Sequence, residues 1–299
     1  MEFNNDLRSG LLWAYRLILN REPEGEHCLE PTDGDDAGSI RARFFRSAEY
    51  QNFVKTRRVI SNLAERSANN LKPRHLLLQT ADSLKYRELL FASARYNSHW
   101  AASANWEHRL HIGSYVPFHP YQATLNRIFL LNELVDSGFK GWVLYIDADN
   151  LLITPPPSHA ELAERASSGK VFWFFNHHRR EDPEFNFFNI NAGAFGIFVG
   201  DPTSNEVIKS WGRFYEHNYD AAFLQSASAW GDIVNDQQSL QLILEAFSDA
   251  FDLPRRIHMD FLYGGFVQSC GRGEENPGEN DLSRRLNEVR DYGRHFYGF

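Results

Sequence analysis

Short runs of continuously apolar residues, separated by segments with helical periodicity, constrain the fold of this chain most. The apolar runs lie at 75–79, 142–146, 171–175 and 194–199, and the segments with helical periodicity at 84–96, 122–138, 205–219 and 239–247. A strand that is apolar throughout is typical of a sheet buried on both faces. The alternation of such strands with amphipathic helices predicts an α/β fold with a mostly parallel central sheet flanked by helices.

The segment before residue 72 has a different pattern. Leu12, Tyr15 and Leu19 share one face of a helix, and helical spacing resumes at 40–54 after a loop. A change in composition at 61–73 separates this segment from the strands that follow. We therefore predict a small all-helical module at 1–65 and an α/β domain at 72–299, and nothing in the module indicates catalysis.

Charge and composition exclude several classes of protein. The chain carries 31 basic and 39 acidic side chains, a formal charge of −8, whereas a nucleic-acid-binding protein needs an excess of positive charge. No apolar run is long enough to span a bilayer, and the first residues do not resemble a secretory signal. Cys28 and Cys270 suit a reducing compartment. We expect a cytoplasmic protein, and peripheral association with the inner face of the membrane stays open.

Two carboxylates follow the apolar run at 142–146. Asp147 and Asp149 are separated by one residue, at the end of a predicted strand where ligands of α/β sheets collect. Carboxylates in this position offer hard oxygen ligands to a divalent cation, which keeps water and phosphate oxygens as its other ligands. A solvated acidic turn is the alternative. The apolar residues on both sides, including Leu151 and Ile153, favour the cation site.

This segment resembles the Asp-x-Asp motif of the GT-A glycosyltransferases, and three later segments resemble motifs of the same superfamily in the same order. They are NINAGAFGIF at 189–198, NDQQSL at 235–240 and HFYG at 295–298, and they are most similar to the glycogenin-like and lipopolysaccharide glycosyltransferases. The resemblance implies a Rossmann-like GT-A domain that transfers a sugar, as a hexosyltransferase does, from a nucleotide-sugar to a carbohydrate or lipid-linked acceptor. UDP-linked donors are expected in preference to GDP-linked ones.

The resemblance also implies a metal site formed by Asp147, Asp149 and His295, with Mn²⁺ or Mg²⁺ as the cofactor. Mn²⁺ accepts a mixed set of oxygen and nitrogen ligands more readily than Mg²⁺ does. His258 and the pair at 177–178 are the alternative histidine ligands. The family continues past its final glycine with Lys-Pro-Trp, whereas this sequence ends at Phe299, so the contact of that lysine with phosphate is expected either from another residue or not at all.

Asn191 and Gly193 are expected to bind the donor sugar, because an amide both donates to and accepts from hydroxyls and glycine permits a close approach. Asp236 and Gln237 are the expected catalytic residues, beside the oxocarbenium-like transition state. A cap at the start of a helix is the alternative role of Asp236. We expect retention at the anomeric carbon, while inversion with Asp232 or Asp236 as the base stays open.

Nucleotide recognition is expected at the end of the first strand. Thr80 and Asp82 lie there, Tyr86 is placed to stack on a base, and Arg127 is the expected phosphate or ribose contact. A solvent-facing arginine on an amphipathic helix is the alternative for Arg127. Three tryptophans are either stacking platforms for the acceptor or core residues: Trp100, Trp106 and Trp230.

The predicted helical module resembles one appended to bacterial surface-polysaccharide enzymes. The residues that carry this resemblance are Tyr15, Arg16, Leu19, Arg21, Pro23, Phe44, Ser47, Glu49 and Tyr50. It implies a role in the biosynthesis of a surface polysaccharide or glycoconjugate. A non-catalytic protein of the same fold that binds a nucleotide-sugar or glycan is one alternative. A nucleotidyltransferase is another, but the segment after the first strand lacks the glycine-rich basic loop of that class.

Overall fold

The structure is a computed structural model of the chain and describes residues 11, 25–30, 75–176, 178–261, 266–268 and 282–298. The chain divides into two compact units, Met1–Lys72 and Pro73–Phe299. In the first unit the structure describes Leu11 and the short 3₁₀ helix η1 (Glu26–Leu29) with its flanking residues. The rest of the predicted helical module, including the residues that carry its resemblance, lies outside the described part of the chain.

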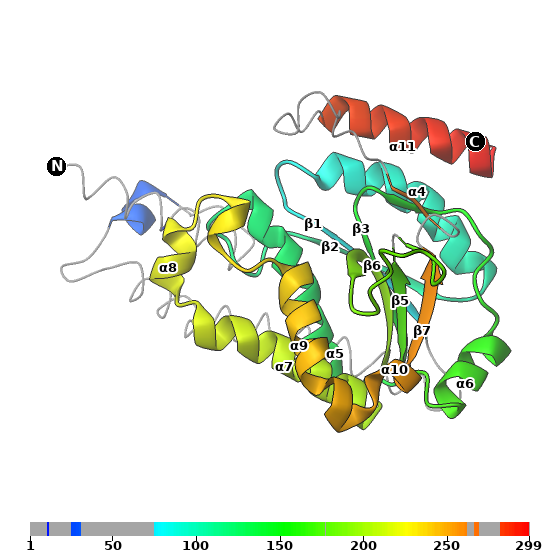
Figure 1. The fold of residues 1–299 in the computed structure, drawn as a ribbon. Coiled ribbons are helices and arrows are strands. Elements are labelled where there is room, and N and C mark those ends of the chain that lie inside the picture. Colours follow the sequence, from blue (N-terminus) through cyan, green and yellow to red (C-terminus); the bar gives the residue numbers. More distant parts are fainter. Residues whose placement is uncertain are drawn as a thin grey trace. The chain divides into compact units, whose positions relative to one another are not determined.

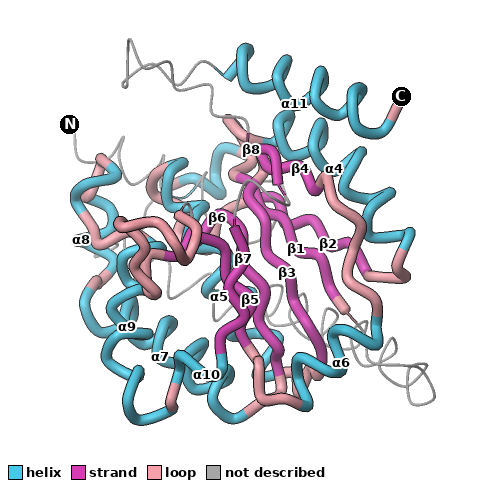
Figure 2. Tube along the Cα trace, turned by 45° about the vertical axis from the view of Figure 1, so that its right-hand side comes forward, coloured by secondary structure: helices cyan, strands magenta, loops and turns pink. Residues whose placement is uncertain are grey.

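The second unit contains a six-stranded sheet in the order β2-β1-β3-β6-β5-β7 (Figure 2). Its strands are β1 (Leu76–Ala81), β2 (Glu107–Ile112), β3 (Gly141–Asp147), β5 (Phe172–Asn176), β6 (Ile190–Val199) and β7 (Ile257–Phe261). β1 pairs in parallel with β2 and β3, and β5 pairs in parallel with β7. β6 is antiparallel to both of its neighbours. The structure therefore confirms the prediction of an α/β fold with a mostly parallel central sheet.

A separate two-stranded antiparallel sheet pairs β4 (Asn150–Leu152) with β8 (Phe266–Gln268). The described helices of the second unit are η2 (Pro120–Leu125), α4 (Arg87–Ser103), α5 (Asn126–Asp136), α6 (His159–Ser167), α7 (Pro202–Asn218), α8 (Ala221–Ser226), η3 (Trp230–Asp232), α9 (Asp236–Phe251), α10 (Leu253–Arg256) and α11 (Leu282–Tyr297). None of these helices combines the length and the apolar character needed to cross a membrane.

Helices cover both faces of the central sheet, because alternate side chains of each inner strand point to opposite faces. On β3, Val143 and Tyr145 belong to the core shared with α5, α7 and α9. Leu144 and Ile146 belong to the core on the other face, which α4 and α6 complete. α11 packs along the outer side of α4 (Figure 1). The strand at 142–146 is thus buried on both faces, as its apolar sequence predicts.

Two elements, β2 and α11, are not revealed by the periodicity of the sequence, and one predicted helix is divided in two. β2 is an edge strand with half-exposed polar residues, so it lacks the apolar signature of the inner strands. α11 is rich in arginine and presents few buried residues, which hides it among polar segments. The helix expected at 122–138 begins as the 3₁₀ turn η2, which carries Pro120 in its first turn, and continues as α5.

Candidate active site

The chain directions of three central strands bring predicted site residues together. β1 and β3 are parallel, so the residues that follow them, Asp82 and Asp149, lie at one edge of the sheet. β6 runs in the opposite direction, and its pairing of Ala194 with Ile146 places the start of β6 beside the end of β3. We call residues 80–86, 147–150 and 190–193 together the carboxyl edge. Ligands of α/β sheets bind at such an edge.

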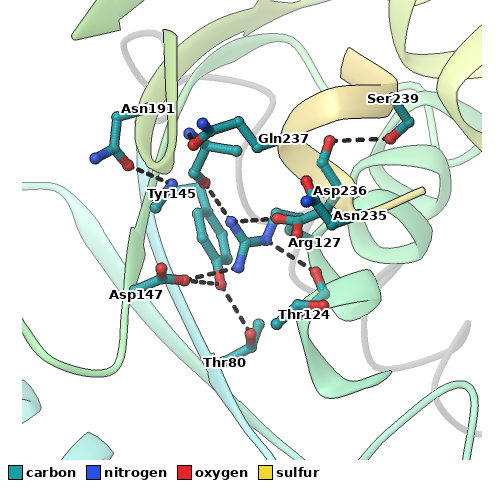
Figure 3. Close-up of polar contacts among 12 residues, drawn as sticks. Thr80, Thr124, Arg127, Tyr145, Asp147, Asn191, Asn235, Asp236, Gln237 and Ser239 are labelled. Carbon is teal, nitrogen blue, oxygen red and sulfur yellow. Dashed lines mark hydrogen bonds and ion pairs between the residues drawn. The ribbon is translucent and has the colours of Figure 1, made fainter. Parts of the chain in front are cut away.

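Arg127 connects three elements at the carboxyl edge (Figure 3). Its Nη2 lies 2.7 Å from Asp147 Oδ1 at the end of β3, and its Nη1 lies 2.8 Å from Asp236 Oδ2 at the start of α9. Nη1 also donates to the carbonyl of Ala192 in β6, and Nε donates to the carbonyl of Thr124. Only 3% of the side chain is exposed. Burial disfavours the charged guanidinium, but Asp147 and Asp236 outweigh it and raise the pKa of Arg127.

This placement contradicts the alternative of a solvent-facing Arg127. The side chain is buried and its Nε, Nη1 and Nη2 donate to groups of the protein, while the expected contact with a phosphate or ribose stays a prediction. Its guanidinium also lies over the ring of Tyr145, 4.3 Å from the centroid. A buried guanidinium held between two carboxylates fixes the positions of the groups around it. Arg127 therefore positions other site residues.

Tyr145 and Thr80 form a hydrogen-bonded chain that ends at the carboxylate of Asp147. The Tyr145 hydroxyl donates to Asp147 Oδ1 over 2.9 Å, and it lies 3.1 Å from Thr80 Oγ1. Burial raises the pKa of Tyr145 well above its ordinary value, so the phenol stays neutral and keeps its proton for Asp147. Thr80 is itself buried, so the structure places this expected donor contact beneath the site rather than on its surface.

Asp147 keeps an open side. Its side chain is 30% exposed, and the absent side chain of Gly193 leaves room for its second oxygen, since a Cβ at Gly193 would lie 2.5 Å from Oδ2. Asn191 lies beside this opening, where its Oδ1 accepts the backbone N–H of Gly193 over 2.7 Å. The structure thus brings the expected metal ligand Asp147 together with Asn191 and Gly193, which are expected to bind the donor sugar. Figure 3 shows Asp147 and Asn191.

The start of α9 brings Asp236 and Gln237 to the same place. Asn235 caps this helix by accepting the N–H of Gln238, so the alternative role of Asp236 as the cap is wrong. Asp236 lies against Arg127 with 4% of its side chain exposed, and burial raises its pKa while Arg127 opposes the rise. Gln237 is half-buried and its Oε1 accepts the N–H of Ala192. Gln237, rather than Asp236, is therefore on the open side of the cluster.

Asp149 is paired with an arginine that sequence reasoning missed. Arg285 of α11 donates through Nη2 to Asp149 Oδ2, and both side chains are largely buried. Burial raises the pKa of Asp149, and the charge of Arg285 opposes that rise. The guanidinium of Arg285 also lies 5.4 Å from the ring centroid of Tyr86. The far C-terminal helix therefore reaches the carboxyl edge between the ends of β1 and β3.

Asp82 organises the loop that follows β1. Its carboxylate accepts the backbone N–H groups of Leu84, Lys85 and Tyr86, and the side chain is buried. These bonds satisfy the amides that precede α4 and bring the Tyr86 ring toward Arg285. Asp82 thus shapes the loop in which a nucleotide contact was expected.

His295 and His258, two of the expected histidine ligands, lie away from the carboxylates. His295 lies exposed on α11, ten residues beyond Arg285, which corresponds to about 15 Å along a helix. His258 of β7 lies 3.3 Å from Asp260 and pairs in the sheet with Trp173, away from the carboxyl edge. His178 is described, whereas residue 177 lies outside the described part. Among the described residues, no group of three or more His, Cys, Asp or Glu side chains is placed to hold a metal ion.

Two further contacts could have been anticipated from the sequence. Tyr145 lies two residues before Asp147 on the same strand, and side chains with this spacing point to the same face. Asn150 follows Asp149 directly, and its amide nitrogen donates to the carbonyl of Gly193 over 2.7 Å. No sequence pattern distinguishes the buried Arg285 from the other arginines of α11, which are exposed.

The expected acceptor platforms divide into two groups. Trp100 and Trp106 are buried in the core beside α4, so a stacking role for them is wrong. Trp230 in η3 is 44% exposed, and its ring stands edge-on to that of Tyr121 at 6.0 Å.

Comparisons with known proteins give structural likeness only. No family model and no curated protein matches the chain. A glycosyltransferase involved in the glycosylation of the major capsid of PBCV-1 is 11% identical with a TM-score of 0.48, over 73% of this chain and 100% of that one. A197 from STIV is 9% identical with a TM-score of 0.33, over 63% and 82%. Mouse xyloside xylosyltransferase 1 is 10% identical with a TM-score of 0.28, over 62% and 85%. The residues of the site, rather than these likenesses, carry the function proposed below.

Proposed function

We propose that the chain is a GT-A-type glycosyltransferase that transfers a sugar from a nucleotide-sugar to a hydroxyl acceptor. The observation that carries this proposal is the meeting of Asp147, Asn191 and Gly193 of the carboxyl edge with Gln237 at the start of α9. Figure 3 shows Asp147, Asn191 and Gln237. Carboxylate, amide and backbone groups are the partners that sugar hydroxyls require. A partly exposed carboxylate among them suits a ligand that brings a cation.

The residues present fit a hard divalent cation, Mn²⁺ or Mg²⁺. Asp147 has an open side, and Asp149 follows it after one residue. The amide oxygen of Asn150 is buried and has no hydrogen-bond partner among the described residues, so one more hard oxygen is present next to Asp149. Asp147 and Asp149 would hold the ion, which when bound stabilises the charge of the departing diphosphate as a Lewis acid. His295 has no part in this proposal, because it lies elsewhere on α11.

The other residues orient the donor sugar and the groups around it. Arg127 and Tyr145 hold the carboxylate of Asp147 in one orientation, which reduces the reorganisation needed when a ligand binds. Gly193 lets the sugar approach the backbone of β6, and Asn191 and Gln237 flank this approach. Preorganised polar groups of this kind lower the barrier when charge develops in the transition state.

We propose retention at the anomeric carbon. Inversion needs a side-chain base opposite the leaving group, but Asp236 is buried in its ion pair with Arg127. Asp232 is exposed in η3, where its carboxylate accepts the N–H of Ala229. With retention, the leaving phosphate oxygen takes the proton of the acceptor hydroxyl on the same face of the sugar. The acceptor would be a carbohydrate or a lipid-linked molecule of a surface polysaccharide, and Trp230 is an exposed aromatic side chain suited to stack on it.

A second candidate is a protein of the same fold that binds a nucleotide-sugar or glycan without turnover. The pairing of both carboxylates with arginines, Asp147 with Arg127 and Asp149 with Arg285, favours it. Such pairs occupy oxygens that an active enzyme offers to its cation.

Incubation with a panel of UDP- and GDP-sugars and Mn²⁺ separates the two candidates. We expect slow release of a nucleoside diphosphate from one donor and loss of this release in Asp147→Asn. The release should continue at the wild-type rate in Asp136→Asn, which changes an exposed aspartate on α5. Melting curves check that both variants fold. Binding of a donor without any release would favour the binding protein, and neither binding nor release would contradict the proposed function.

A further inference from the structure

The charges at the carboxyl edge do not favour a diphosphate as they stand. Asp82, Asp147 and Asp149 of the carboxyl edge and the neighbouring Asp236 contribute four carboxylates, and Lys85, Arg127 and Arg285 contribute three basic groups. A nucleoside diphosphate group carries about two further negative charges, which repel like charges at short range. Binding of a donor therefore requires an added cation and also a basic side chain that is able to turn toward the phosphates.

Arg127 does not meet this requirement. Its Nε donates to the carbonyl of Thr124, and its Nη2 donates to Asp147. Its Nη1 donates to the carbonyl of Ala192 and pairs with Asp236. Releasing it would leave Asp147 and Asp236 without their buried counter-charge, which is costly.

Arg285 is placed differently. It reaches the carboxyl edge from α11, where it pairs with Asp149. Its guanidinium lies over the ring of Tyr86, so the side chain stands between the loop after β1 and the turn after β3. These two chain segments follow neighbouring parallel strands, and a phosphate group bound at such an edge lies between them.

We propose that Arg285 is a diphosphate-binding residue, held by Asp149 until the donor arrives with its cation. This inference rests on the proposed function. With the donor bound, the cation would take the place of the guanidinium beside Asp149, and Arg285 would donate charge-assisted hydrogen bonds to the phosphate oxygens. Every buried charge keeps an opposite partner through the exchange, so no step leaves an unpaired ion. The ring of Tyr86 would orient the guanidinium of Arg285 both before and after the exchange.

Calorimetric titration of the full chain with Mn²⁺ alone, and with UDP or GDP at saturating Mn²⁺, tests this proposal. In Arg285→Ala, Mn²⁺ alone should bind more tightly, because Asp149 has lost its competing partner. The nucleoside diphosphate should bind about tenfold more weakly or worse, as expected when a charged hydrogen bond is lost. Arg285→Lys should lie between the wild type and Arg285→Ala, because lysine keeps the charge but lacks the two-pronged geometry.

Arg284→Ala is the matched control. Arg284 precedes Arg285 on α11, is more than half exposed and pairs with Glu288 of its own helix. Both affinities should stay at wild-type values in this variant. A merely structural role of Arg285 would weaken both affinities together, and this result in Arg285→Ala and Arg285→Lys would overturn the proposal, as would unchanged nucleoside diphosphate binding. If the wild type bound neither UDP nor GDP, the proposed function itself would fail.

Discussion

At the scale of single residues, Arg127 determines the geometry of the site. Its guanidinium joins the end of β3 to the start of α9 and to the backbone of β6, and it is almost fully buried. Two carboxylates are oriented by this one side chain. Removing a partner from a buried ion pair costs much more than the pair contributes, because the remaining charge stays buried.

We expect Arg127→Met to lower the free energy of unfolding by about 3 to 5 kcal/mol, because it leaves Asp236 as an unpaired buried carboxylate and removes the ion-pair partner of the partly exposed Asp147. Urea unfolding followed by tryptophan fluorescence measures this loss. Arg213→Met is the control, since Arg213 forms an exposed pair with Glu206, and exposed pairs contribute about 0 to 1 kcal/mol. Equal losses in the two variants would contradict the role given to Arg127.

At the scale of elements, the packing of α11 on α4 decides whether Arg285 reaches the site. Gly293 of α11 lies directly against the ring of Tyr96 of α4, where a Cβ would lie 2.1 Å from Cε2. Tyr297 anchors the end of the same helix by donating its hydroxyl to the carbonyl of Leu152, and burial raises its pKa to about 12. The close approach at Gly293 and the anchor at Tyr297 set the distance between α11 and the carboxyl edge.

Gly293→Ala should push α11 away from α4 and lower the free energy of unfolding by about 1 to 3 kcal/mol, the usual cost of overpacking. The amides of α11 should also exchange with deuterium faster than in the wild type, as mass spectrometry of its peptides would show. Gly231→Ala is the control, because no atom lies within 4 Å of a Cβ added there. Unchanged exchange in α11 would mean that the contact between Gly293 and Tyr96 does not set the position of this helix.

The sequence predicts the elements of the core and part of the site, for physical reasons. The apolar runs at β3, β5 and β6 reveal buried strands, and the carboxylates after β3 reveal the carboxyl edge. The partners of those carboxylates depend on contacts between residues far apart in the chain, such as Arg285 with Asp149. Periodicity carries no information on such contacts. His295 lies within α11, at a distance from the carboxylates beside which it was expected. The four-residue motif that contains His295 does not reveal this helix.

At the scale of the whole molecule, buried histidines make stability depend on pH. Burial, with a smaller contribution from neighbouring His159, lowers the pKa of His75 to about 4, and burial lowers the pKa of His108 to about 4. In the unfolded chain both take up a proton near pH 6.5. Between these values the unfolded state binds more protons than the folded state, so stability falls as the pH is lowered from about 6.5 to 4.

We expect His75→Asn to flatten this pH dependence. The variant should be less stable than the wild type at pH 7, yet lose less stability between pH 6.5 and 4, because the buried imidazole is gone. Urea unfolding at several pH values measures both effects. His217→Asn, which changes an exposed histidine at the end of α7, should keep the wild-type slope. A wild-type slope in His75→Asn would show that this imidazole does not carry the dependence.

The molecule is acidic, with a formal charge of −8, and its candidate active site holds more carboxylates than guanidinium groups. A diphosphate bound beside these carboxylates would need a cation or basic side chains to offset its charge, and Asp147 and Asp149 are the residues proposed to recruit the cation. We therefore expect a nucleoside diphosphate to bind here together with a divalent ion.

Melting curves of the full chain with UDP or GDP, each with and without Mn²⁺, test this claim most directly. Either UDP or GDP, at a large excess over its dissociation constant and with Mn²⁺ present, should raise the melting temperature by about 5 °C or more. The same nucleotide should have little effect without the metal, or with it in Asp147→Asn. An unchanged melting temperature with both nucleotides in the presence of Mn²⁺ would contradict the account.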